Sequence, residues 1–69
     1  METADDYKIL YGLLSAYRGQ VLDEADRLGA DGVPDEAASR LADADVLDAA
    51  LDIIKTDAEL RFPADTVAP

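Results

Sequence analysis

The sequence between residues 4 and 28 reads ADDYKILYGLLSAYRGQVLDEADRL. Its apolar residues recur at intervals of three and four along the whole stretch, which is close to the period of an α-helix. They form one narrow stripe of seven positions: Tyr7, Leu10, Leu14, Tyr17, Val21, Ala25 and Leu28. A stripe of this width is typical of a helix that packs along its length on a partner helix. The pattern therefore predicts a long amphipathic helix.

Local signals set the limits of this predicted helix. Thr3 can cap its first turn, and Asp6, three residues later, completes an acidic form of the capping box. Arg27 lies in the last turn, and Gly29 can adopt the left-handed conformation just beyond the end. At about 1.5 Å per residue the helix is roughly 37 Å long, so only another long helix can cover its stripe.

The second half of the chain supplies that helix. Residues 29–34 read as a turn, with Pro34 at the first position of a helix that continues to residue 61. A connection of this length joins antiparallel helices, so the predicted fold is an all-α helical hairpin. Pro63 ends the second helix by restricting the residue before it, and residues 63–69 are predicted to be an extended tail.

One mismatch lies inside the second helix. The apolar positions between residues 46 and 60 cover about half of the helix circumference, but Leu41 falls on the polar side when the same register is extended backwards. This mismatch predicts a kink or a short break at residues 42–45, with Asp45 capping a new helix. One continuous helix is the alternative.

Composition limits how such a chain can be stabilised. Sixty-nine residues predict one helical domain over residues 1–62, near the lower size limit for independent folding. The chain has no cysteine and no histidine, which excludes disulfides and makes structural zinc implausible. A small domain without these supports needs the burial that a partner chain provides.

The charge is strongly negative, with 16 acidic and 6 basic residues and a formal net charge of −10. Such a chain is repelled by nucleic acid and by anionic lipid, so neither is expected as a direct partner. The acidity also fits simple solubility, or a halophile with a saline cytoplasm. No apolar run is long enough to span a membrane and no secretion signal is visible, which predicts a cytoplasmic or virion-associated protein.

The potentially reactive side chains fit no recognisable catalytic or metal-binding site. Ser15 and Ser39 have no histidine to activate them, and the carboxylates of Asp48 and Asp52 lack the loop that a calcium site needs. Glu24, at the edge of the apolar stripe, is expected to pair across the hairpin with Arg18 or Arg40. The sequence predicts no catalytic residue, no cofactor and no metal, and therefore no enzyme.

Association is the strongest functional inference. The apolar faces of a lone hairpin are wider than one facing helix can cover, and exposed apolar area of this kind marks an interaction surface. The predicted partner-interface residues are Ile9, Tyr11, Leu13, Leu22, Val46, Ala50, Ile53, Leu60 and Phe62. Pairing of two hairpins into a four-helix bundle would cover them, and so would docking on a larger host protein.

Two functions are therefore expected from the sequence. The first is a non-enzymatic assembly module, a small acidic accessory or structural subunit that binds itself, a host protein, or both. The alternative is an acidic inhibitor, similar in principle to an antitoxin, that occupies a basic and nucleic-acid-binding site on a partner. The two differ in their dependence on salt, because an electrostatic contact weakens steeply as ionic strength rises.

Overall fold

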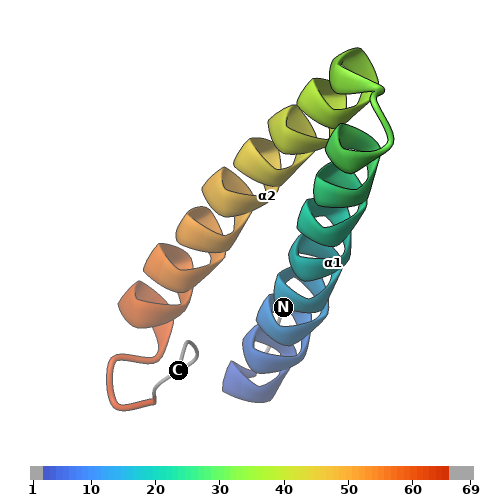
Figure 1. Ribbon diagram of the computed structural model, residues 1–69. Helices are drawn as coiled ribbons and strands as arrows, with labels where there is room; N and C mark the ends of the chain where they lie inside the picture. The colour runs from blue at the N-terminus through green and yellow to red at the C-terminus, as the bar shows by residue number, and fades with distance from the viewer. Residues whose placement is uncertain (1–2, 66–69) are drawn as a thin grey trace.

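The computed structural model describes residues 3–65, and these form a hairpin of two long antiparallel helices (Figure 1). Helix α1 spans Ala4–Ala30 and helix α2 spans Pro34–Arg61. The helices lie side by side from the turn to the opposite end, in a rod with extents of 47 × 17 × 14 Å (Figure 1). The predicted helical hairpin is confirmed.

The predicted capping box begins α1. The Asp6 backbone N–H donates to the Thr3 side-chain oxygen at 3.2 Å, and the Thr3 backbone N–H donates to the Asp6 carboxylate at 3.3 Å. Two backbone donors that no helical carbonyl can reach are thereby satisfied. Asp5 adds a second negative charge to the first turn, where the helix dipole favours it.

The turn between the helices differs from the prediction in one respect. Gly29 lies inside α1, and the left-handed residue is Gly32, with φ +80°. The Val33 N–H donates to the Leu28 carbonyl at 3.0 Å and the Gly32 N–H to the Gly29 carbonyl at 3.3 Å. This is the bonding pattern of a Schellman motif, which places the left-handed glycine one residue after the cap, here Asp31. The helix therefore continues to Ala30, past its predicted end.

Most of the predicted stripe on α1 is buried or half-buried, but Tyr17 is exposed. Its expected place is taken by Arg18, which is half-buried. The row of α1 that keeps a strict four-three spacing comprises Tyr7, Tyr11, Leu14, Arg18, Val21, Ala25 and Leu28. Tyr17 belongs to the predicted stripe but not to the packed row. Apolar character alone cannot separate two overlapping rows, and the guanidinium of Arg18 contacts Asp48 on α2.

Helix α2 is continuous, so the predicted break at residues 42–45 was wrong. Its buried positions lie seven residues apart and are mostly alanines: Ala37, Ala44, Leu51 and Ala58. This row runs straight through the suspected break, so Leu41 can remain half exposed without disturbing the helix. Small side chains on α2 leave room for the larger ones that α1 contributes, among them Tyr7, which is almost completely buried.

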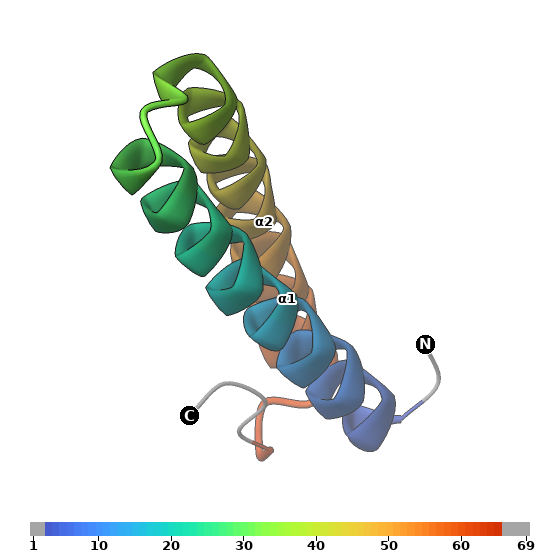
Figure 2. The same ribbon diagram turned by 45° about the vertical axis from the view of Figure 1, so that its right-hand side comes forward.

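The segment after α2 lies at the open end of the hairpin, where α1 begins (Figure 2). Phe62 caps the helix, and its N–H donates to the Ala58 carbonyl at 2.7 Å. Its ring lies edge-on to the ring of Tyr7, with centroids 5.9 Å apart. The Asp65 N–H then donates to the Phe62 carbonyl at 3.0 Å, which closes a turn. The remainder of the predicted tail, residues 66–69, lies outside the described residues.

Candidate protein-interaction surfaces

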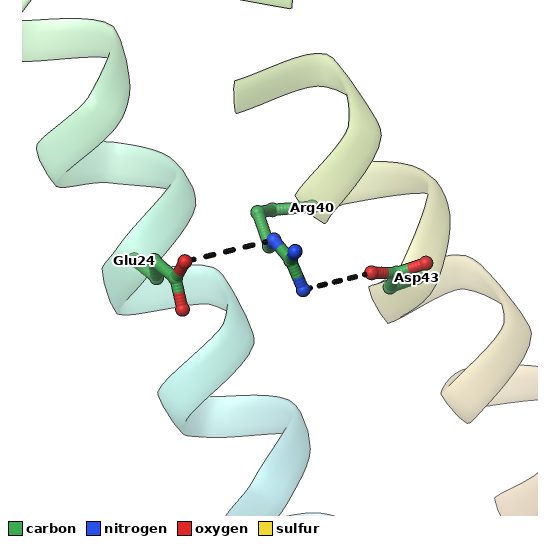
Figure 3. A network of polar contacts seen from close by, with 3 residues as sticks. All are labelled: Glu24, Arg40 and Asp43. Carbon is green, nitrogen blue, oxygen red and sulfur yellow. Dashed lines mark hydrogen bonds and ion pairs between the residues drawn. The ribbon is translucent and has the colours of Figure 1, made fainter. Parts of the chain in front are cut away.

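Two ion pairs connect the helices. Arg40 of α2 contacts Glu24 of α1 at 3.6 Å and Asp43 of its own helix at 3.2 Å (Figure 3). Arg18 of α1 contacts Asp48 of α2 at 2.5 Å. Of the two partners that the sequence left open for Glu24, the structure selects Arg40. Glu24 and Arg18 lie six residues apart, about 120° around α1, so the two bridging pairs lie on different sides of the hairpin.

These pairs contribute little to stability. All of their side chains are substantially exposed, and exposed ion pairs are worth about 0–1 kcal/mol each. The hydrogen bond between Tyr7 and Asp57 keeps the same alignment as the ion pair between Glu24 and Arg40. Tyr7 lies 17 residues before Glu24 on α1, and Asp57 lies 17 residues after Arg40 on the antiparallel α2. The alignment therefore holds along the length of the hairpin.

The Tyr7–Asp57 hydrogen bond lies at the open end of the hairpin. The phenol of Tyr7 donates to the carboxylate of Asp57, which also accepts from Arg61 at 3.3 Å. This hydrogen bond from Tyr7 is the main reason why the pKa of Asp57 falls below its ordinary value of 3.8. The same hydrogen bond, with burial second, raises the pKa of Tyr7 above 10.0.

Replacing Tyr7 with Phe should destabilise the hairpin in a pH-dependent way. Asp57, with a lowered pKa, stabilises the fold above 3.8 and loses that contribution as pH falls through its folded pKa. Tyr7, with a raised pKa, stabilises it below 10.0 and loses that contribution as pH rises through its folded pKa. The difference in unfolding free energy between wild type and Tyr7→Phe should therefore be flat between these limits and shrink beyond both. Urea titrations at several pH values would measure it, and a difference that does not change with pH would contradict it.

A second regular row lies on the outside of α2, and we call it the outer stripe. It comprises Ala42, Val46, Ala49, Ile53, Thr56 and Leu60, again at alternating spacings of four and three. At about 100° per residue, its centre lies on the side of α2 opposite the buried row. All six residues are exposed, and Leu60 retains 79% of its accessible surface.

A smaller apolar area, the α1 patch, lies on the first half of α1. It comprises Ile9, Leu13 and Tyr17, all more than half exposed. Between residues 4 and 22 the chain carries two aspartates, one lysine and one arginine, whose formal charges cancel. The α1 patch therefore lies on a neutral part of an otherwise acidic molecule.

The other predicted interface residues are less accessible. Tyr11, Leu22, Ala50 and Phe62 are half-buried within the hairpin itself. Phe62 packs on Tyr7, as described above. The five predicted interface residues on the two exposed areas are Ile9, Leu13, Val46, Ile53 and Leu60. The sequence interpretation placed the last three at the edge of one broad apolar face, and the structure places them on a separate face.

A row of carboxylates runs beside the outer stripe. Asp45, Asp52 and Glu59 each precede a stripe residue by one position, and all three are exposed. Within residues 3–65 none of them forms an ion pair or a side-chain hydrogen bond. Lys55 lies three residues after Asp52 and four before Glu59, a spacing that allows ion pairs on a helix, but it forms an ion pair with neither. The negative charge beside the stripe is therefore uncompensated by the hairpin.

The flank on the other side of the stripe is acidic too. It carries Asp43 and Asp57, separated by Ala50. These two carboxylates are engaged within the hairpin, Asp43 with Arg40 and Asp57 with Tyr7 and Arg61. The outer stripe is therefore bordered by acidic side chains along both edges.

An open groove lies near the turn, with a volume of about 520 Å³. It is lined mainly by apolar and small residues: Leu22, Ala25, Asp26, Gly29, Ala30, Ala37 and Leu41. Asp26 is the one charged residue of this lining and the groove is open to solvent, so it brings together no set of groups for catalysis.

Among residues 3–65, no three histidine, cysteine, aspartate or glutamate side chains lie together as a metal site would require. Neither helix within the same part of the chain is long and apolar enough to cross a membrane. Comparisons of the chain with protein-family models, with curated proteins and with solved structures find no match in any of the three. A functional interpretation therefore depends on the two exposed apolar areas and on the charges around them.

Proposed function

We propose that this protein is a non-enzymatic assembly module, a small acidic subunit that binds other chains through the outer stripe and the α1 patch. The observation that carries the proposal is the second heptad row on α2, which the hairpin leaves exposed. A helix whose only role is to pack on one partner needs one apolar face, and its opposite face is normally polar. α2 has two.

The two apolar areas suit different partners. The α1 patch is small and lies on a neutral segment, so a second copy of the chain meets less electrostatic repulsion there than at the outer stripe. The outer stripe is longer and acidic on both edges. Self-association through the α1 patch together with docking of a host protein on α2 would cover both areas.

The alternative function, an acidic inhibitor of a basic site, draws support from the free carboxylates of Asp45, Asp52 and Glu59. It requires the charges but not the apolar stripe between them. Binding that survives an apolar-to-acidic change at Ile53, and that weakens with salt alone, would favour this alternative.

The assembly function can be tested with a double variant, Leu13→Asp with Ile53→Asp. Both residues are exposed, so the far-ultraviolet circular dichroism and the melting of the variant should match those of the wild type. The wild type should form a larger species in light scattering or retain a specific partner from its native source, and the variant should lose both. A wild-type chain that is monomeric, and whose partners the variant also retains, would exclude the proposal.

A further inference from the structure

We propose that the outer stripe of α2 binds an amphipathic helix of a different protein, one whose apolar row is bordered by lysine or arginine. This inference depends on the proposed assembly function and specifies its partner. It is drawn from the geometry of the stripe, from the charges along its edges, and from the absence of an internal partner for those charges within the described residues.

The geometry of the stripe fits a helix. Its six residues alternate at spacings of four and three from Ala42 to Leu60, which is the repeat that keeps a seam facing one partner helix. At about 1.5 Å per residue the stripe is roughly 27 Å long, or about five helical turns. Ala42 and Ala49 alternate along it with the larger Val46, Ile53 and Leu60. A facing helix would therefore meet both protruding side chains and recesses into which its own side chains could pack.

The charges along the edges disfavour a second copy as the occupant. In a coiled coil, residues that border the seam meet those of the partner and decide which partners pair. In a parallel pair of α2 helices, Asp45, Asp52 and Glu59 would meet the edge that holds Asp43 and Asp57. In an antiparallel pair the first edge would meet itself. In the antiparallel pair free carboxylates would face each other, and like charges held together oppose association. In the parallel pair they would meet carboxylates that Arg40, Arg61 and Tyr7 already engage, and would gain no basic partner.

The same edges favour a basic helix. Between residues 42 and 60 the chain has six acidic residues and one basic residue, Lys55. Lys55 lies beyond the edge that carries Asp52 and Glu59, on the side away from the stripe, and it forms an ion pair with neither of them. A partner with lysine or arginine beside its apolar row would pair with the three carboxylates that the hairpin leaves free.

The test uses two synthetic helical peptides of about three heptads, identical in their leucine and alanine seam positions. One carries lysine at the bordering positions and the other carries glutamate. Binding to the full chain would be followed by fluorescence anisotropy. The lysine peptide should bind, the glutamate peptide should not, and the affinity for the lysine peptide should fall as salt rises from about 50 to 500 mM.

Two matched variants separate docking from general attraction between opposite charges. Ile53→Asp in the outer stripe and Leu13→Asp in the α1 patch each add one negative charge to the protein. If the lysine peptide docks on the stripe, Ile53→Asp should weaken binding about ten-fold or more while Leu13→Asp changes it less than about two-fold. General electrostatic attraction would make both variants bind slightly more tightly, and that result would overturn the proposal.

Light scattering on the same variants distinguishes the remaining outcomes. Wild-type self-association that Ile53→Asp abolishes and Leu13→Asp spares would mean that a second copy occupies the stripe, and would overturn this inference while leaving the assembly function standing. Self-association that only Leu13→Asp abolishes agrees with the inference. Absence of self-association combined with failure to bind either peptide would overturn the inference, and the native-source test would then decide the assembly function by itself.

Discussion

Replacing Val21 with Asp is expected to unfold the hairpin, whereas the same replacement at Val46 is expected to leave it folded. Val21 is 2% exposed in the row between the helices, and Val46 is 68% exposed on the outer stripe. An unpaired carboxylate in a buried position costs several kcal/mol, and a domain of this size has only about 3–5 kcal/mol of stability in total. A substitution at an exposed position away from such features changes stability by about 0.5 kcal/mol or less.

Circular dichroism and urea titration of the two variants would measure this contrast. The pair is matched, because both changes replace valine with aspartate in the interior of a helix and add one negative charge. Loss of helicity in Val46→Asp would show that the outer stripe is needed for the hairpin to fold. Retention of full stability in Val21→Asp would mean that the two helices are packed through other residues.

The second large effect is expected from removing the charges beside the stripe. The combined change Asp45→Asn, Asp52→Asn and Glu59→Gln removes the free edge of carboxylates without altering an apolar residue. Two outer stripes could then approach each other, and we expect self-association to strengthen by about ten-fold, the sum of several small like-charge repulsions. The lysine peptide should bind this variant more weakly than the wild type, since its charge partners are gone.

Sedimentation velocity over a range of concentrations would measure the self-association of the triple variant. Adding Ile53→Asp to it provides the control, because the new association should disappear if it occurs through the outer stripe. A triple variant that remains in the same state as the wild type would show that the acidic edges do not determine which chain the stripe accepts.

The hairpin could be predicted from the sequence because its signals are local or periodic. The capping residues Thr3 and Asp6, the proline at residue 34 and the long apolar stripe of the first helix each indicate one structure by themselves. The continuous α2 could not be predicted in the same way. Its buried row is built on Ala37, Ala44 and Ala58, and alanine occurs on any face of a helix, so the larger apolar residues dominated the pattern.

For the same reason, the sequence did not reveal that α2 carries two rows on opposite sides. Val46, Ile53 and Leu60 are the most conspicuous heptad in the second half of the chain, and the sequence alone does not say that they point away from α1. That depends on where the alanines pack, which in turn depends on the large residues of α1 that need space. The spacing of seven between Ala37, Ala44, Leu51 and Ala58 is the signal that could have revealed a second row.

We propose that the outer stripe of α2 serves another chain and not the stability of the hairpin. The most direct measurement is the free energy of unfolding of Ile53→Asp, determined on the same samples that are titrated with the lysine-bordered peptide. We expect the free energy of unfolding to change by about 0.5 kcal/mol or less while peptide binding is lost. A variant that unfolds as readily as Val21→Asp, or that is stable and still binds the peptide, would contradict it.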